Sequence, residues 1–226
     1  MFDEIAGIYD LGNHLLSLGQ DFFWRKRLAM ELRNYQPLAV LDLGSGTGDL
    51  AFAVKKQNPD ATIIGIDLAK NMLKIGADKI LKCGLKDSIF LAQADIEQMP
   101  FPEQSFDATT IAFGVRNLED RSKGLAEIFR ILNPGGVFAV LEFSLPEKGF
   151  FSRIYRFYLG GILPRLGQLI GGQSAYFYLR DTIQEFPPSH LFSYELAQAG
   201  FVIKELTALS LGSVCLYLAE KPKNQG

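Results

Sequence analysis

The sequence has few of the residues that build metal centres and disulfide frameworks. Its 226 residues include two cysteines, Cys83 and Cys215, and two histidines, His14 and His190. Two cysteines so far apart form neither a disulfide framework nor a zinc-type motif. We therefore expect chemistry without a metal, and two cysteines that are buried as small apolar residues in a reducing compartment.

Long apolar runs and a clear excess of either charge are also missing. No run of about 18 uncharged apolar residues occurs, which predicts no transmembrane helix, and the N-terminus lacks the basic and apolar regions of a signal peptide. The 23 Lys and Arg residues stand against 25 Asp and Glu residues, so no global attraction to nucleic acid or to an anionic membrane is expected. With 48% hydrophobic residues, residues 1–226 are expected to form a single cytoplasmic domain with one substantial core.

Short apolar segments alternate with helical patterns through the middle of the chain. We expect strands at 62–66, 89–94, 106–113 and 137–143, helices at 68–85 and 121–132, a turn at 133–136, and two closing strands at 201–206 and 213–219. Such alternation predicts a parallel sheet with helices on both faces. Residues 1–37 are expected to form a helical cap whose aromatic cluster, Phe22, Phe23 and Trp24, packs against the core.

The stretch Val40–Asp49 predicts a strand, a tight turn and the start of a helix. Glycines at 44, 46 and 48 follow Asp42, and in an open α/β sheet such a turn lies where ligands bind. A dinucleotide fingerprint would have its third glycine where Asp49 stands. Because Asp42 and Asp49 place negative charge on both sides of the turn, it suits a nucleoside ligand with a cationic end better than a diphosphate.

Two further acids follow the next strands. Asp67 comes nineteen residues after Gly48 and can accept both hydroxyls of a ribose, and Asp95 ends the following strand. Capping of the next helix explains either acid singly. Three acids at three successive strand ends favour one shared site.

The turn, Asp67 and the pair Asp95–Ile96 resemble the glycine loop, ribose acid and adenine-edge pair of class I S-adenosylmethionine (SAM) methyltransferases, over about residues 38–143. The resemblance implies a Rossmann-like sheet of seven mostly parallel strands, with the last strand antiparallel, and SAM as the cofactor. It implies cofactor contacts from Asp42, Gly44, Gly46, Thr47, Gly48, Asp67, Leu68, Met72, Asp95, Ile96 and Ala112.

Four further stretches, residues 9–24, 113–117, 130–144 and 175–179, resemble signatures of the ubiquinone/menaquinone-biosynthesis C-methyltransferases. That resemblance covers almost the whole chain and implies methylation of a ring carbon of a polyprenylated quinol. The chain departs from the family pattern at Gly12, where Met is common, at Asp21, where His is common, and at Asn133, where Lys is common. A role for the missing histidine cannot be transferred, and we expect Asp21 to face solvent.

Arg116 and Asn117 follow the fourth strand and are candidate catalytic residues. A guanidinium stays protonated, so Arg116 would stabilise a developing quinolate oxygen or orient a water that takes the proton. Asn117 can hydrogen-bond the second ring oxygen. The alternative is a structural ion pair of Arg116 with Glu119 or Asp120.

Tyr9 and Tyr176 are further candidates for the catalytic pocket, because each combines a hydroxyl with an aromatic face. Glu142 ends the fifth strand and is either an acid–base partner or a helix cap. Residues 144–200 are expected to cover the substrate, between a SAM-binding core at 38–143 and closing strands at 201–226. Within them, residues 148–172 form either a lid that touches a membrane surface or an ordinary solvated cap.

Three functions fit these patterns: a quinol C-methyltransferase, an O- or N-methyltransferase of the same fold acting on another small molecule, and a non-catalytic nucleoside-binding module. Asp21 and the short N-terminal segment resemble menaquinone-type members, which favours demethylmenaquinol as the substrate. A benzoquinol of the ubiquinone pathway or a phylloquinone-type substrate is the alternative. The oligomeric state stays open, with a homodimer as one option.

Overall fold

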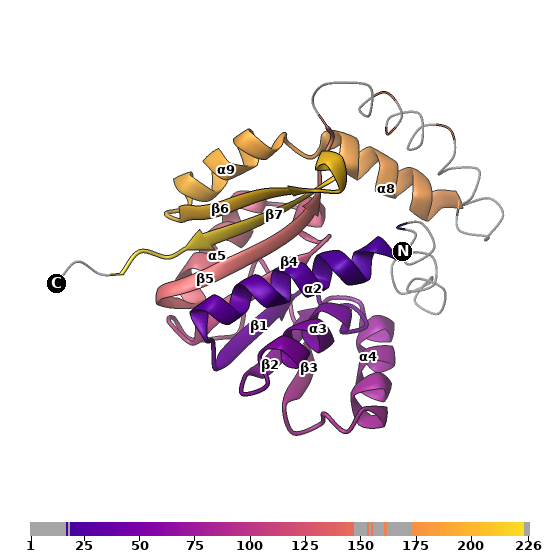
Figure 1. The fold of residues 1–226 in the computed structure, drawn as a ribbon. Helices are drawn as coiled ribbons and strands as arrows, with labels where there is room; N and C mark the ends of the chain where they lie inside the picture. The colour runs from indigo at the N-terminus through magenta and orange to yellow at the C-terminus, as the bar shows by residue number, and fades with distance from the viewer. Residues whose placement is uncertain are drawn as a thin grey trace.

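The computed structural model describes residue 17, residues 19–146, residues 153, 155 and 161, and residues 173–223, with only the backbone of 173–176. These residues contain one seven-stranded sheet with the order β3-β2-β1-β4-β5-β7-β6 (Figure 1). The strands are β1 Ala39–Leu43, β2 Thr62–Asp67, β3 Ile89–Gln93, β4 Phe106–Ala112, β5 Leu132–Phe143, β6 Val202–Leu209 and β7 Val214–Glu220. The strands from β1 to β5 pair in parallel, whereas β7 is antiparallel to both of its neighbours. The expected α/β sheet with an antiparallel last strand is confirmed.

Helices cover both faces of this sheet. They are α2 Gln20–Leu32, α3 Asp49–Gln57, α4 Lys70–Lys82, α5 Arg121–Ile131, α8 Gln173–Glu185 and α9 Ser189–Gln198, with the short turns η1 Arg33–Tyr35, η2 Val115–Asn117 and η4 Ser210–Gly212. One core joins α2, α3 and α4 to the sheet through residues such as Leu28, Val54 and Ile80. The other joins α5 and α9 through Ile128 and Phe192. Because the inner strands are buried on both faces, their sequences are nearly continuous apolar runs.

Two expectations about packing are wrong. In the aromatic cluster, Trp24 is buried at 4% exposure, but Phe22 and Phe23 are 58% and 60% exposed. Consecutive residues of a helix point about 100° apart, so three aromatics in a row cannot share one buried face. Cys215 is buried as expected, whereas Cys83 at the end of α4 is exposed.

The expected turn at Asn133–Gly136 lies inside β5. Phe106 pairs with Leu132 and Ala108 with Val137, so the four residues 133–136 bulge from the strand opposite one residue of β4. Gly135, at φ +83°, donates its N–H to the carbonyl of Lys221 at 2.8 Å. The end of β7 therefore holds the bulge within the sheet.

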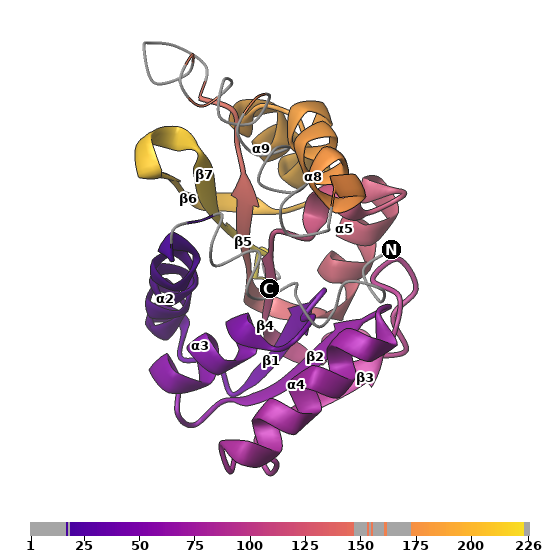
Figure 2. The same ribbon diagram turned by 90° about the vertical axis from the view of Figure 1, so that its right-hand side faces the viewer.

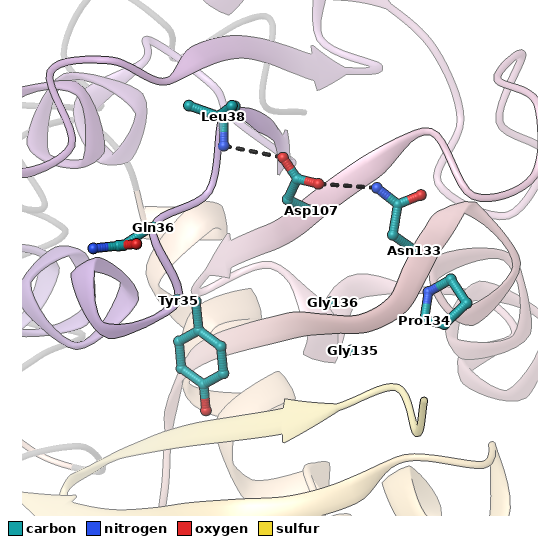
Figure 3. A pocket seen from close by; sticks show the side chains of 8 residues that line it. All are labelled: Tyr35, Gln36, Leu38, Asp107, Asn133, Pro134, Gly135 and Gly136. Carbon is teal, nitrogen blue, oxygen red and sulfur yellow. Dashed lines mark hydrogen bonds between the residues drawn. The ribbon is translucent and has the colours of Figure 1, made fainter. Parts of the chain in front are cut away.

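A hollow of about 280 Å³ lies beside this bulge, at the amino ends of the parallel strands (Figure 3). Asp107 accepts hydrogen bonds there from the backbone N–H groups of Leu38 and Ala39, both at 3.0 Å, and from the amide of Asn133 at 2.9 Å. These hydrogen bonds lower the pKa of Asp107 against the opposing effect of burial, which is the largest single influence. Asn133 thus stabilises the end of the sheet opposite the glycine turn.

Candidate active site

The glycine turn follows β1 at the carboxyl end of the sheet, where the sequence predicted it. Gly44, Gly46 and Gly48 have φ values of +59°, +54° and +88°, in the left-handed region that other residues rarely adopt. Ser45 donates its N–H to the carbonyl of Ile66 at 3.0 Å, which fixes the turn to the end of β2. The turn leads directly into α3, with Gly48 at the N-cap position.

Asp67, at the end of β2, is in direct contact with this turn. Its Oδ2 accepts the N–H of Gly46 at 2.8 Å, and its Oδ1 accepts the N–H of Ala69 at 2.8 Å. A hydrogen bond therefore joins Gly46 and Asp67, which we placed in one site because each follows the end of a strand. These two hydrogen bonds hold the carboxylate at the turn, and a carboxylate is an acceptor for ligand hydroxyls.

Asp42 lies beneath the turn and is 1% exposed. The hydroxyl of Thr110 donates to its Oδ1 at 2.7 Å, and its Oδ2 is buried without a hydrogen-bond partner in the described part of the chain. Burial raises the pKa of Asp42 from 3.8 to about 7, although the Thr110 hydrogen bond and the charge of Arg25 both lower it. A buried carboxyl of this kind is poised to change its charge state when a cation approaches.

A lysine ties the turn to α4. Lys79 Nζ donates to Thr47 Oγ1 and to Asp49 Oδ1, both at 3.0 Å. The helix can come so close because residue 76 is glycine: a Cβ there would lie 3.2 Å from the carbonyl group of Thr47 and 2.7 Å from Leu91 Cδ1. Position 76 was not recognised in the sequence, and a glycine inside a helical pattern is the signal that could have found it.

The other predicted cofactor contacts lie along the same edge of the sheet, at or just after the ends of β2, β3 and β4. Leu68 is 63% exposed at the start of the β2–α4 connection, whereas Met72 is buried at 3%. Asp95 is exposed and accepts the N–H of Glu97 at 2.8 Å, and Ile96 beside it is half-buried. Ala112, the last residue of β4, is also half-buried.

Arg116 forms a buried ion pair with Glu142, so the alternative of an ion pair with Glu119 or Asp120 is wrong. Arg116 Nη1 donates to Glu142 Oε1 at 2.7 Å, and the two side chains are 4% and 0% exposed. Glu142 also accepts the N–H of Arg116 at 3.2 Å and the N–H of Phe143 at 2.8 Å. Asp120 instead caps α5 by accepting the N–H of Lys123 at 3.0 Å.

Helix α8 holds the two catalytic candidates from the other side. Tyr178 donates its hydroxyl proton to Asn117 Oδ1 at 3.1 Å, and Arg116 Nε donates to Thr182 Oγ1 at 3.3 Å. Figure 2 shows α8 beside the end of the sheet where β5 finishes. Tyr178 and Thr182 were not among the predicted site residues, because nothing in the sequence indicates which turn of α8 faces η2.

Asp21 does not face solvent. It is 2% exposed, forms an ion pair with Arg25 one turn later in α2, and accepts the hydroxyl of Ser17 at 2.6 Å. The spacing of four residues on one helix brings the two charges together. Asp21, which we expected to face solvent, is therefore part of a buried charge pair.

The two ion pairs are connected through aromatic rings. The Arg25 guanidinium lies 5.7 Å from the centroid of Phe113, the rings of Phe113 and Phe143 are 4.4 Å apart, and Arg116 lies 5.3 Å from the centroid of Phe143. Trp24 packs edge-on against both rings, at 5.8 Å and 6.3 Å. Phe113 has a φ of +59°, which is unfavourable for an aromatic residue. We call Arg25, Phe113, Phe143 and Arg116 the guanidinium–ring stack.

The side chains of two predicted residues lie outside the described part of the chain. Tyr9 lies outside the described residues, and of Tyr176 only the backbone, in α8, is described. The segment 148–172 lies outside them too, except for residues 153, 155 and 161. No group of three metal-ligating side chains occurs in the part of the chain that the structure describes, and no described helix is long and apolar enough to cross a membrane.

Comparison with known families shows to which family the chain belongs. The sequence profile of the ubiE/COQ5 methyltransferase family matches residues 1–221. The chain belongs to the ubiE/COQ5 methyltransferase family. The matched residues include all seven strands, the glycine turn and η2, so these elements belong to one methyltransferase fold.

Relatives in the ubiE/COQ5 family are similar over nearly their whole length. The demethylmenaquinone methyltransferase of Thermus thermophilus is 42% identical over 223 residues, which cover 98% of this chain and 100% of that protein. The ubiquinone/menaquinone biosynthesis C-methyltransferase UbiE of Geobacter sulfurreducens is 40% identical over 98% of this chain and 87% of its own.

Solved structures of low sequence identity share the fold. A SAM dependent methyltransferase from Aquifex aeolicus superposes with a TM-score of 0.61 over 86% of this chain and 92% of its own, at 18% identity. The ubiE/COQ5 chain described here therefore has the class I methyltransferase fold.

Proposed function

We propose that this chain transfers the methyl group of SAM to a ring carbon of a polyprenylated quinol, converting demethylmenaquinol into menaquinol. The observation that supports this best is a pair of hydrogen-bond donors, Arg116 and Asn117, held rigidly at the end of β4. They stand in a chain whose full-length relatives include several named demethylmenaquinone methyltransferase, among them those of Thermus thermophilus and Bacteroides fragilis.

The residues at the glycine turn fit SAM. The left-handed glycines leave backbone accessible where a nucleoside must approach closely, and Asp67 offers lone pairs to the ribose hydroxyls. The buried, unpaired Oδ2 of Asp42 is an acceptor without a donor, which a cationic ligand end would compensate. We assign the adenine end to Leu68, Asp95 and Ile96. When bound, SAM supplies an electrophilic methyl group on a sulfonium.

Arg116 and Asn117 provide what the acceptor ring requires. A ring carbon becomes nucleophilic when an adjacent hydroxyl ionises, and a fixed positive charge stabilises the resulting oxyanion. Nε and Nη1 of Arg116 are used by protein groups, and Nη2 has no hydrogen-bond partner among the described residues, so we assign Nη2 to that oxygen. Because Asn117 Oδ1 accepts from Tyr178, its Nδ2 protons are left for the second ring oxygen.

The surroundings of Arg116 fix the direction in which its remaining N–H groups point. The side chain is 4% exposed, and charges interact more strongly where water is excluded. Glu142 neutralises one end of the guanidinium and fixes its plane, so the remaining N–H groups keep their direction throughout the reaction. We propose that residues 144–200 cover the acceptor, as the contacts of α8 with η2 suggest.

The experiment is a transfer assay with methyl-labelled SAM and short-tailed demethylmenaquinol, with the product analysed by NMR. We expect label on the ring carbon, and a loss of at least 100-fold in kcat for Arg116→Met. Arg121→Met is the matched control, because Arg121 forms a half-exposed ion pair with Glu195 of α9. Label on oxygen, or equal activity of the two variants, would refute the proposal.

A benzoquinol acceptor is the second candidate, because relatives such as that of Geobacter sulfurreducens are named for both ubiquinone and menaquinone biosynthesis. The same assay with a 2-polyprenyl-6-methoxybenzoquinol compares kcat/KM for the two rings. We expect the naphthoquinol to be preferred. A preference for the benzoquinol would reassign the substrate without changing the roles proposed for Arg116 and Asn117.

A further inference from the structure

Helix α2 carries an exposed stripe on the side turned away from its core-facing residues. Phe23, Lys26, Met30 and Arg33 follow one another at intervals of three, four and three residues, so they lie along one line of the helix. Phe23 is 60% and Met30 45% exposed, and both basic residues are exposed. We call these four residues the α2 stripe.

The turn between β6 and β7 adds another exposed apolar residue beside the start of α2. Leu211 is 76% exposed and has a φ of +58°, which is unfavourable for a branched apolar side chain. Ser210, next to it, accepts a hydrogen bond from Trp24 Nε1 at 2.9 Å and donates one to Gln20. Figure 1 shows the first turn of α2 and η4 at the end of the molecule where the parallel strands finish.

The stripe itself carries two basic and no acidic residues, although the whole chain has a formal net charge of −2. Both acidic residues between positions 20 and 33 are neutralised: Asp21 by Arg25, and Glu31 by Arg27. Lys26 and Arg33 have no ion-pair partner among the residues that the structure describes. The stripe therefore alternates apolar and unpaired basic side chains.

The stripe begins next to the candidate active site. Trp24, the residue after Phe23, packs against Phe113 and Phe143 at the ends of β4 and β5. A surface that contacted the stripe would thus be separated from the ends of β4 and β5 by the helix α2.

From these observations we propose that the α2 stripe and Leu211 dock the enzyme on an anionic lipid surface. Apolar and aromatic side chains enter the interface, while Lys26 and Arg33 bind phosphate headgroups. The inference extends the proposed function, because a polyprenylated acceptor dissolves in lipid and reaches a site at the lipid surface without crossing water. A second copy of this chain fits the stripe less well, since the stripe contains no acidic residue that could pair with Lys26 and Arg33 of the other copy.

The first test is binding to vesicles made of equal parts phosphatidylglycerol and phosphatidylcholine, compared with phosphatidylcholine alone. We expect sedimentation with the anionic vesicles, and at least a tenfold weaker association for Phe23→Ser/Met30→Ser and for Lys26→Glu/Arg33→Glu. The matched control is Leu191→Ser/Tyr194→Ser on α9, where two side chains are 47% and 63% exposed on another helix. The control should bind as the native protein does.

A tryptophan placed in the stripe by Phe23→Trp provides a second, independent readout. Phosphatidylglycerol brominated on its acyl chains should quench the fluorescence of this variant more than that of the native protein, whose single tryptophan, Trp24, is 4% exposed. Circular dichroism and SAM affinity of the variants should remain native, which excludes misfolding as the cause.

The outcomes separate this inference from the proposed function. With acceptor in anionic vesicles, Phe23→Ser/Met30→Ser should lose at least tenfold in rate, whereas its rate on a short-tailed acceptor in solution should stay unchanged. Native protein that does not bind the vesicles, variants that bind as well as native, or a stripe variant that converts a dimer into a monomer would each overturn the inference. If the native enzyme bound vesicles but methylated no quinol, the proposed function alone would fail.

Discussion

Replacing Asp42 with asparagine should change how the stability of the protein depends on pH. Burial raises the pKa of Asp42 from 3.8 to about 7 in the folded protein without ligand. Between these values the folded state keeps a proton that the unfolded state has lost, so the free energy of unfolding falls as the pH rises. Once Asp42 is fully ionised, the difference between its two pKa values lowers the free energy of unfolding by about 4 kcal/mol. Asparagine remains neutral and keeps an oxygen for the hydroxyl of Thr110.

Chemical denaturation from about pH 4 to about pH 8 measures this effect. The stability of Asp42→Asn relative to native protein should increase steadily over that range, by up to about 4 kcal/mol. Asp60→Asn is the control, because Asp60 is exposed in the turn after α3. If the native protein and Asp42→Asn showed parallel stability curves, the reasoning about burial would be refuted.

The same carboxyl should connect SAM affinity to pH. A cation beside Asp42 favours its ionised form, so SAM binding to native protein near pH 6 should release about one proton, and fewer as the pH rises. Titration calorimetry in two buffers of different ionisation enthalpy counts that proton. Asp42→Asn should release none and bind SAM more weakly. Equal proton release by both proteins would show that Asp42 does not sense the ligand.

The remaining predictions concern single contacts. Glu142→Gln removes one partner of a buried ion pair and should lower the free energy of unfolding by about 3–5 kcal/mol, as measured by denaturant unfolding. Glu195→Gln, in a half-exposed ion pair, is the control. An equal loss of stability in the two variants would contradict the prediction. Gly46→Ala, at φ +54°, should weaken SAM binding at least tenfold in calorimetry, while Gly84→Ala, at φ +69° outside the site, should not. Lys221→Met leaves the carbonyls of residues 129 and 132 without their hydrogen-bond donor, and should lower the free energy of unfolding by about 2–4 kcal/mol in the same assay. Lys223→Met is the control, because Lys223 is exposed, and it should leave the free energy of unfolding almost unchanged.

The sequence predicted the parts of the site that depend on strand ends. Because parallel strands finish at one edge, the glycine turn, Asp67 and Arg116 could be placed together from their positions after apolar runs. The hydrogen bond between Gly46 and Asp67 agrees with that placement. The roles assigned to Arg116, Asn117, Tyr9 and Tyr176 stay predictions.

Partners chosen by packing could not be predicted. Arg116 had acids nearby in sequence, yet it pairs with Glu142, 26 positions away, because β4 and β5 are neighbours whose ends meet. The burial of Asp21 depends in the same way on how α2 lies against the sheet. The exposure of Phe23 could have been predicted, since adjacent helical residues cannot all face inward.

The guanidinium–ring stack has a mechanical consequence. Its four members bridge α2 and η2 in van der Waals succession, and close-packed interiors transmit displacement instead of absorbing it. A displacement of α2 would therefore reach the guanidinium of Arg116 through packed side chains, without passing along the backbone.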